Sequence, residues 1–288
     1  MKSSAGKAFR HAISEENPLQ ILGCINAYNA IMAEKNGAKS LYLSGAGVAN
    51  ASYGIPDLGL TSLDDILIDA ERISRASECP LLVDIDTGFG DHKSIAKCIK
   101  ALEGAGVAAV HIEDQIDQKR CGHRPGKKIV SSEAMQDRIK AAVDARTDAN
   151  FFIMARTDAF AQEGLDRAVE RSQAYSSCGA DGIFAEAITE ESHYRAFSEG
   201  LNIPILANMT EFGLTDLYSS EELSQWGVAM VLYPLSAFRA MNKASEQVYR
   251  SIMKNGHQRD QVEKMQTRAE LYEYLSYYES ENKIDKQI

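Results

Sequence analysis

The sequence predicts an α/β fold in which eight strand–helix units close into a (β/α)8 barrel of the TIM type. The first observation is that short apolar, β-rich runs alternate along the chain with amphipathic helical segments. The second is that a polar residue follows almost every run, and the third is a length of 288 residues, which suits one complete barrel. We expect a single barrel domain over residues 1–288 with a C-terminal helical extension. A doubly wound parallel sheet is the competing architecture.

Eight candidate strands can be counted along the chain. Each is a short run rich in Val, Ile, Leu and Phe, and helical patterns separate the runs. The runs span residues 19–25, 40–43, 81–83, 108–112, 151–155, 182–184, 203–206 and 228–232.

The intervening segments have the spacing of amphipathic helices. Several are followed by a glycine, which favours a helix C-terminus. The clearest helical patterns span residues 63–76, 94–103, 131–145, 165–178 and 190–198.

Groups capable of chemistry follow the strands at their carboxyl ends. In a parallel barrel these ends face one rim, so residues far apart in sequence would converge there on one ligand. This pattern favours the barrel over the doubly wound sheet. The residues concerned are Asn26, Ser44, Asp84, Asp86, Glu113, Arg156, Glu186, Asn208 and Tyr233.

Composition narrows the class of partner. The formal charge is -10 and no sustained basic face is evident, which argues against binding to nucleic acid or to an anionic membrane. The first residues lack an apolar signal segment, and no apolar run is long enough to span a bilayer, so we expect a cytoplasmic protein. The five cysteines show no C-x-x-C pair, and we expect reduced thiols, four of them buried.

Asp84 and Asp86 stand two residues apart at the end of a predicted strand. Side chains with this spacing can point to the same side and present hard oxygens to a divalent cation. Mg²⁺ suits such a sparse site because it usually keeps several waters and takes one or two carboxylates. The alternative is that both aspartates only cap the following loop and helix.

A loop of small residues follows the second predicted strand. Backbone N–H groups at Ser44, Gly45 and Ala46 could approach a substrate carboxylate closely, and Asp57 further along could help to hold metal-bound water. The alternative is a surface turn in which glycine only provides conformational freedom.

Residues 119–128 form a basic, glycine-containing loop after the fourth predicted strand, and loops of this kind often serve as lids. We expect Lys119, Arg120 and His123 to lower the pKa of the Cys121 thiol, so that it exchanges a proton near neutrality. A lone cysteine is more often structural and a charge run is more often a solvated face, but here the thiol lies inside the charge run.

Together these motifs resemble the 2-methylisocitrate lyase family of the isocitrate lyase and phosphoenolpyruvate mutase superfamily, from about residue 20 to 280. Cys121 favours the lyase branch because the mutases generally lack the loop cysteine. One departure is Gly126, where the family commonly has Asn, and it puts the rigidity of the loop in doubt. The similar segments are KRCGHRP, YLSGAGVA, LLVDIDTGFG, HIEDQ, IMARTDA, EAITE, ILANMTEFG, YPLSAFRAMN and MQTRAELYE.

The resemblance implies a barrel whose last helix is exchanged between subunits of a homotetramer, with Mg²⁺ at each site. It implies retro-aldol (Claisen-type) cleavage of the tricarboxylate 2-methylisocitrate to pyruvate and succinate, in the methylcitrate cycle of propionate catabolism. An isocitrate lyase, an oxaloacetate hydrolase or a decarboxylase would use the same barrel and metal. A non-catalytic barrel that binds a metal or an organic acid is the alternative of a different class.

The resemblance also implies roles for individual residues. Asp84 and Asp86 would hold Mg²⁺, and Cys121 would protonate the succinyl carbanion while Lys119 and His123 stabilise charge. The base that takes the hydroxyl proton stays open among Tyr42, Glu113 and metal-bound hydroxide. The residues implied in substrate binding are Ser44, Gly45, Ala46, Asp57, Gly122, Arg156, Glu186, Asn208, Met209, Thr210, Arg239 and Arg268.

Overall fold

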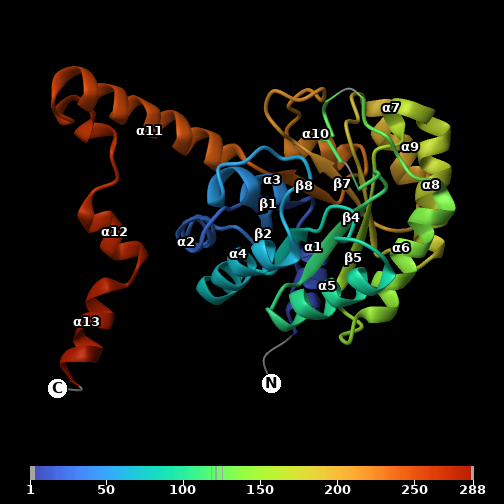
Figure 1. Ribbon diagram of the computed structural model, residues 1–288, viewed down its shortest axis with the longest axis horizontal. Coiled ribbons are helices and arrows are strands. Elements are labelled where there is room, and N and C mark those ends of the chain that lie inside the picture. The colour runs from blue at the N-terminus through green and yellow to red at the C-terminus, as the bar shows by residue number, and fades with distance from the viewer. Residues whose placement is uncertain (1–3, 118, 121, 125, 287–288) are drawn as a thin grey trace.

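The computed structural model describes residues 4–117, 119–120, 122–124 and 126–286, and its centre is a closed barrel of eight parallel strands (Figure 1). The strands follow one another around the barrel in chain order, and the first pairs with the last. Every predicted strand is present within two residues of its expected ends, which confirms the barrel and excludes the doubly wound sheet. The strands are β1 (Leu19–Gly23), β2 (Ser40–Leu43), β3 (Leu81–Asp84), β4 (Ala109–Glu113), β5 (Phe152–Thr157), β6 (Gly182–Ala185), β7 (Ile205–Asn208) and β8 (Met230–Tyr233).

Helices surround the barrel and connect successive strands (Figure 1). They are α2 (Ala27–Lys35), α3 (Gly45–Gly47) with the π-helix η1 (Val48–Ser52), α4 (Leu63–Ala76), α5 (His92–Gly104), α6 (Ser132–Ala145), α7 (Phe160–Glu163), α8 (Leu165–Ser177), α9 (Glu191–Gly200) and α10 (Ser220–Gln225). The N-caps Ser62, Asp91 and Ser131 each accept a hydrogen bond from a backbone N–H of the first turn, which fixes where α4, α5 and α6 begin.

Apolar side chains form two layers of core. Inside the barrel, side chains such as Leu19, Leu82 and Met230 are fully buried. A larger layer, which includes Ile66 and Ile99, lies between the strands and the surrounding helices. Since the barrel interior is filled, a ligand site can lie only at one of its ends.

Helix α1 (Ala5–Glu15) closes the amino-terminal end of the barrel, and it has no counterpart among the segments expected from the sequence. Phe9 is fully buried and packs edge-to-face on Phe152, with ring centroids 5.2 Å apart. A Cβ at Gly6 would lie 2.5 Å from the backbone of Asn150, so only glycine allows this approach. The opposite end is therefore left for chemistry.

The C-terminal arm, residues 236–285, leaves the barrel and extends far from it (Figure 1). It consists of α11 (Ser236–Asn255), η2 (Arg259–Lys264), α12 (Arg268–Tyr274) and α13 (Tyr277–Asp285). It touches its own barrel at α2, where Lys35 Nζ donates to the Glu273 carbonyl at 2.8 Å. Tyr249 is 68% exposed and Met253 is 85% exposed, so α11 presents apolar side chains that this chain leaves uncovered.

The cysteines are less uniformly buried than the sequence suggested. Cys24 and Cys98 are buried, and burial raises the pKa of each thiol to about 12. Cys79 and Cys178 are only partly buried, which corrects the expectation of four buried thiols, and all four are free.

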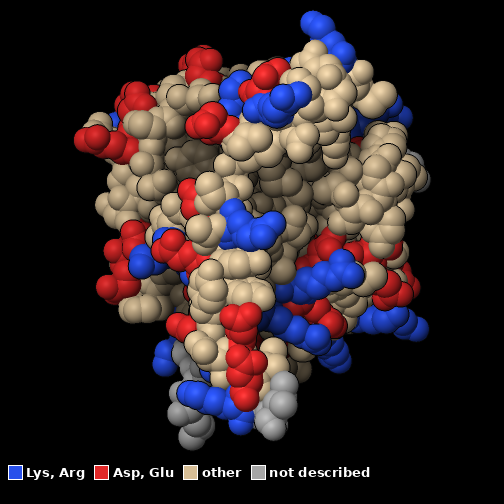
Figure 2. Space-filling model, turned by 90° about the vertical axis from the view of Figure 1, so that its left-hand side faces the viewer, with Lys and Arg blue, Asp and Glu red and all other residues tan. Residues whose placement is uncertain are grey.

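The surface agrees with the mixed composition of the chain. On the face shown in Figure 2, Lys and Arg are interspersed with Asp and Glu, and broad uncharged areas lie between them. Among the described residues, no helix has the length and apolar character needed to cross a bilayer.

Candidate active site

A cavity of about 90 Å³ lies at the carboxyl ends of the strands, at the rim where the sequence analysis expects a ligand site. The strands that surround it are far apart in sequence but adjacent in the barrel. The predicted residues that line it are Tyr42, Ser44, Ala46, Asp57, Asp84, Glu113, Lys119, Gly122, His123, Arg156, Glu186, Asn208, Thr210 and Arg239.

Asp84 and Asp86 lie side by side after β3. Asp84 Oδ1 accepts from the Asp86 backbone N–H at 3.0 Å, and Asp84 Oδ2 accepts from the Gly45 N–H at 3.2 Å. A Cβ at Gly45 would lie 3.2 Å from Asp86 Oδ1 and 3.3 Å from Asp84 Oδ2, so both carboxylates face this glycine. The N-cap of the following helix, α5, is Asp91, which removes the alternative that Asp84 and Asp86 serve as its caps.

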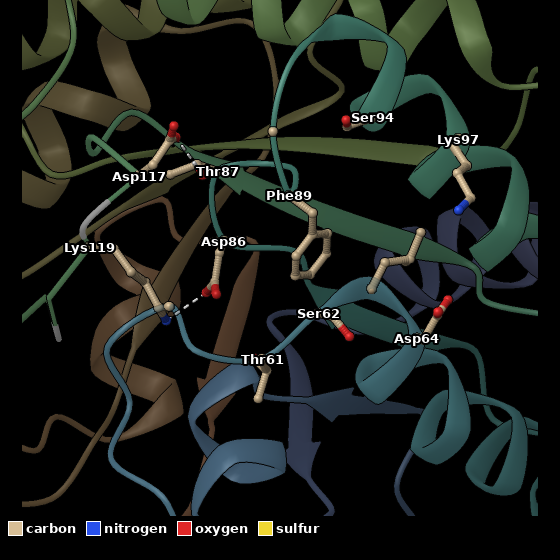
Figure 3. Close-up of a pocket in the computed structure, with 13 residues that line it drawn as sticks. Thr61, Ser62, Asp64, Asp86, Thr87, Phe89, Ser94, Lys97, Asp117 and Lys119 are labelled. Carbon is tan, nitrogen blue, oxygen red and sulfur yellow. Dashed lines mark hydrogen bonds and ion pairs between the residues drawn. The ribbon is translucent and has the colours of Figure 1, made fainter.

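Lys119 compensates the charge of this acidic cluster. Its Nζ lies 2.6 Å from Asp57 Oδ1 and 2.6 Å from Asp86 Oδ1, and Figure 3 shows the second of these ion pairs. Burial opposes the charge on Lys119, but Asp86, Asp84 and Glu113 outweigh it and raise its pKa well above the usual value.

The two aspartates titrate differently. Burial and the negative charge of Asp84 raise the pKa of Asp86 to about 7. Burial also disfavours charge on Asp84, but His111, Lys119 and Arg156 outweigh it and lower its pKa to about 2. Lys119 alone therefore does not balance the negative charge of Asp84 and Asp86. A further cation would stabilise the ionised form of both aspartates.

Arg156, on β5, lies among three buried carboxylates. Its Nε is 3.2 Å from Glu113 Oε2 and 3.0 Å from Asp158 Oδ2, and its Nη2 is 2.9 Å from Glu186 Oε2. The guanidinium also lies 5.0 Å from the centroid of the Phe184 ring, a cation–π contact. Burial disfavours its charge, but these carboxylates raise the pKa of Arg156 well above the usual range.

The two glutamates beside Arg156 are pushed in opposite directions. Burial raises the pKa of Glu113 well above its usual value, although Arg156 opposes the shift. Burial acts on Glu186 as well, but Arg156 and His123 outweigh it and hold its pKa well below the usual range. The pKa values of the two carboxyl groups are thus shifted apart. Glu113 takes up a proton more readily, whereas Glu186 stays ionised.

His123 joins the basic loop to the far wall of the cavity. Its Nδ1 accepts the Leu214 backbone N–H at 2.9 Å, and its Nε2 lies 3.0 Å from Glu186 Oε1. Since Nδ1 accepts, Nε2 is the ring nitrogen that donates to Glu186. Lys119 and His123 are thus both engaged with carboxylates, and Cys121, whose pKa they were expected to lower, lies outside the described residues.

Tyr42 lies beneath the acidic cluster with His111, which the sequence analysis did not single out. The Tyr42 hydroxyl is 2.9 Å from His111 Nε2, and the His111 ring is fully buried. Burial lowers the pKa of His111 to about 4, so the ring is uncharged near neutrality. Burial and the charge of Asp84 raise the pKa of Tyr42 well above its usual value, which makes it a poor base.

The small-residue loop after β2 forms helix α3 and η1 rather than an open turn. Gly45 does not have a positive φ, so its role is close approach to the aspartates and not conformational freedom. Its N–H already donates to Asp84 and is not free for a substrate carboxylate, in contrast to the expectation. Gly126 has a φ of 80°, a conformation that suits both glycine and asparagine.

Met209 and Arg268 lie away from the cavity, Cys121 cannot be placed, and Arg239 lines the cavity only at its rim. Met209 is buried and does not line the cavity. Arg239 reaches the rim, with its Nε 3.6 Å from Glu211 Oε2. Arg268 begins α12 on the C-terminal arm and does not line the cavity of its own chain, and Cys121 lies outside the described residues.

Sequence reasoning also missed Lys127 and Asp158. Both are buried, and Lys127 Nζ lies 2.5 Å from Asp158 Oδ1. Asp158 could have been suspected from the sequence, because the polar pair Thr157–Asp158 directly follows Arg156 near the end of a predicted strand.

A larger pocket of about 510 Å³ adjoins the acidic cluster (Figure 3). Asp86 and Lys119 point toward one another at its edge, and Phe89 projects into it. Its serines, Ser62 and Ser94, are already engaged as partners of Asp65 and Asp91 at the starts of α4 and α5. Asp86 lines this larger pocket and Asp84 lines the smaller cavity, while Lys119 lines both, so the two spaces meet at the acidic cluster.

The donor set fits a hard divalent cation. Within the described ranges no group of three or more His, Cys, Asp and Glu residues is close enough to enclose a metal by itself. Mg²⁺ needs less than that, because one or two carboxylates can hold it together with waters and substrate oxygens. Asp84 and Asp86 provide those carboxylates, and Glu113 Oε1 nearby is a buried oxygen that accepts no hydrogen bond from the described residues.

A filled barrel with buried acids, a clamping arginine and a basic loop at the strand ends is the arrangement of a (β/α)8-barrel enzyme. The family model described as phosphoenolpyruvate phosphomutase matches residues 9–253. A 2-methylisocitrate lyase of Shewanella oneidensis is 61% identical, over 99% of this chain and 98% of that protein. One of Escherichia coli is 56% identical, over 98% and 96%.

Solved structures agree. The structure of a 2,3-dimethylmalate lyase, described as a member of the PEP mutase/isocitrate lyase superfamily, superposes with a TM-score of 0.91 at 32% identity and covers 100% of this chain and 96% of that one. A phosphonopyruvate hydrolase in complex with oxalate and Mg²⁺ gives 0.85 at 26% identity, over 97% and 98%. The chain belongs to the phosphoenolpyruvate phosphomutase family of the isocitrate lyase/PEP mutase superfamily, which confirms the resemblance stated from its motifs.

Proposed function

We propose that the protein is a 2-methylisocitrate lyase, a carbon–carbon lyase that cleaves 2-methylisocitrate to pyruvate and succinate in propionate catabolism. The observation that carries the proposal is its identity of 56–61% with named 2-methylisocitrate lyases over nearly its whole length. The cavity at the strand ends supports it, because the buried acids, the arginine and the basic loop that the reaction needs all line one space.

The polar walls suit a substrate with several carboxylates. The planar guanidinium of Arg156 can hold a carboxylate in two hydrogen bonds, and Asn208 and Thr210 provide further donors on the same wall. Arg239 at the rim would bind a second carboxylate. Arg268 would line a cavity only if the C-terminal arm of one subunit reached the barrel of another.

Apolar residues on the same cavity suit the methyl group that distinguishes 2-methylisocitrate from isocitrate. The transfer of a methyl group from water to an apolar wall is favourable. The hydrogen atom that isocitrate has in its place would leave that wall less well packed. The apolar lining residues are Phe184, Leu232, Pro234 and Leu235.

Asp84 and Asp86 would hold Mg²⁺, with Asp57 nearby to orient a water. A bound Mg²⁺ would act as a Lewis acid toward the hydroxyl and carboxylate oxygens of the fragment that becomes pyruvate. The phosphonopyruvate hydrolase structure, which is a complex with oxalate and Mg²⁺, supports this choice of metal.

The proposed reaction needs one group that donates a proton to carbon and one base that removes the hydroxyl proton. Cys121 protonates the succinyl carbanion, and Lys119 and His123 stabilise charge beside it. Among the candidate bases Glu113 is favoured over Tyr42, because Glu113 Oε1 is buried without a hydrogen-bond partner among the described residues, whereas the Tyr42 hydroxyl lies 2.9 Å from His111 Nε2.

We also propose that the protein works in the cytoplasm as a homotetramer with exchanged C-terminal helices, without nucleic acid or membrane as partner. The exposed apolar side chains of α11 support a subunit contact there.

The test is a product assay on the purified protein. Release of pyruvate from 2-methylisocitrate is measured beside release of glyoxylate from isocitrate, with oxaloacetate as a third substrate. We expect pyruvate release to dominate and a chelator to abolish it. Glyoxylate or oxalate as the main product would replace the proposal with another lyase or hydrolase, and ligand-induced stabilisation without any product would indicate a binding protein.

A further inference from the structure

Lys127 is a buried lysine that nothing in the proposed mechanism uses. Its residue is 9% exposed, and its Nζ lies 2.5 Å from the Gly122 carbonyl oxygen and 2.5 Å from Asp158 Oδ1. The Lys127 ammonium thus links its own position and Gly122 in the basic loop to Asp158, which directly follows β5. A lysine is rarely buried unless its charge is paired, as it is here.

The cavity leaves no room for a side chain at Gly122. A Cβ at this position would lie 2.5 Å from Glu186 Cγ and 2.6 Å from Glu186 Oε2, and it would also collide with Arg156. The loop backbone therefore rests directly on the charged pair that faces the substrate. A small displacement of Gly122 would move the residues on either side of it.

Asp158 connects the same lysine to Arg156. Its Oδ2 is 3.0 Å from Arg156 Nε, and its own backbone N–H donates to Asp114 Oδ1 at 2.8 Å. Lys127 binds Asp158 Oδ1 at 2.5 Å, so Arg156 Nη2 makes only a longer hydrogen bond of 3.4 Å to that oxygen and lies closer, at 2.9 Å, to Glu186 Oε2. Without the ammonium, Asp158 would draw the guanidinium toward itself.

We propose that Lys127 is a positioning residue: it fixes the loop against the cavity through the Gly122 carbonyl and orients Arg156 through their shared partner Asp158. It touches no reacting atom. This inference rests on the proposed function for its kinetic consequence, whereas its consequence for the loop is independent of any substrate.

The test uses the double variant Lys127→Met/Asp158→Asn. The single change Lys127→Met would leave the buried Asp158 carboxylate with Arg156 as its one remaining cation among the described residues and would destabilise the fold, whereas the double variant removes the lysine and aspartate charges together. Lys128→Met is the matched control, because Lys128 is the adjacent lysine and is exposed. Three quantities are compared with the wild type: the melting temperature, the rate of tryptic cleavage after Arg120, and kcat and KM for 2-methylisocitrate.

We expect the double variant to melt within about 4 °C of the wild type. Cleavage after Arg120 should accelerate by about tenfold as the loop loses its attachment. The value of kcat/KM should fall by about 10- to 100-fold, with a rise in KM from the misplaced Arg156 and a fall in kcat from the misplaced loop. Lys128→Met should match the wild type in all three.

Unchanged loop cleavage in the double variant would overturn the proposal. So would a large loss of melting temperature with kcat and KM of the folded enzyme unchanged, because that pattern denotes a structural role only. If the wild type itself yields no product, the proposed function fails, but loop cleavage still decides whether Lys127 fixes the loop.

Discussion

At the scale of single residues, buried charge is the main feature of the site. Arg156 faces Glu113, Asp158 and Glu186 within 3.2 Å, and Lys119 faces Asp57 and Asp86 within 2.6 Å. Buried ion pairs of this kind do not have to stabilise a fold, since desolvation offsets their attraction. Their concentration at one rim indicates that they serve a charged ligand.

The assignment of Cys121 as proton donor makes a direct prediction. Cys121→Ser should abolish turnover of 2-methylisocitrate and leave its binding largely intact, because a hydroxyl of similar size is a much poorer acid. Steady-state kinetics and calorimetric titration check the two halves. Loss of binding together with turnover would refute the role.

The lowered pKa of Glu186 predicts how its contribution to stability varies with pH. Its folded pKa lies below the usual 4.5, so the stabilisation is complete above pH 4.5 and is lost as the pH falls toward the folded pKa. Glu186→Gln should lower the free energy of unfolding by about 1.5–3 kcal/mol at pH 7, the range for hydrogen bonds to charged groups. The difference from the wild type should shrink below pH 4.5 in urea titrations.

Glu221→Gln is the control for this titration, because Glu221 is an exposed residue of α10. It should differ little from the wild type at either pH. A deficit in Glu186→Gln that stayed constant from pH 7 to pH 3.5 would show that the ionised carboxylate is not its source.

Much of the site could be predicted from sequence, but only where position along a strand was informative. Asp84, Arg156 and Glu186 end or follow strands, so barrel geometry places them at one rim. Lys127 and Asp158 were missed because nothing in their spacing shows that a loop lysine folds back onto a carboxylate.

At the scale of secondary structure elements, α1 is the part that sequence reasoning did not find. Helix α1 is as amphipathic as the outer helices, but it precedes the first strand and so stands outside the repeating strand–helix units, and its importance comes from Phe9 entering the barrel, a tertiary contact. The tail was expected to be helical, but periodicity could not show that it extends away from the barrel (Figure 1).

The role of α1 as the closure of the barrel predicts a large effect on stability. Phe9→Ala should lower the free energy of unfolding by about 3–5 kcal/mol, because it empties a fully buried position. Urea denaturation measures it, and the active site at the opposite end should keep its KM. Phe212→Ala, at a residue that is 92% exposed, should cost less than about 0.5 kcal/mol. Equal effects of the two changes would contradict the closure role.

The C-terminal arm carries a prediction about assembly. Tyr249 and Met253 lie one helical turn apart on α11, and both are exposed in the single chain. Replacing both by Ala should shift the proposed tetramer toward smaller species, because apolar area that a partner would cover is lost. Light scattering after gel filtration reports the mass.

Lys254→Ala, a change of a charged residue on the same helix, is the control and should leave the assembly unchanged. A tetramer that survives the double Ala change without weakening would place the subunit contact elsewhere.

At the scale of the whole molecule, the barrel separates stability from chemistry. One end is closed by α1 and apolar packing, and the other gathers acids, Arg156 and the basic loop around one cavity. This division explains how a chain of formal charge -10 can bind an anionic substrate, since its cations are placed locally where the carboxylates of the ligand would lie.

We propose that this rim cleaves 2-methylisocitrate with the help of a divalent cation held by Asp84 and Asp86. The most direct measurement follows pyruvate and succinate together after the metal-stripped wild type receives Mg²⁺, with Asp84→Asn treated in parallel. We expect both products to appear in equal amounts only when Mg²⁺ is restored, and we expect Asp84→Asn to form neither. Equal product formation by the stripped enzyme, or by Asp84→Asn, would contradict the proposal.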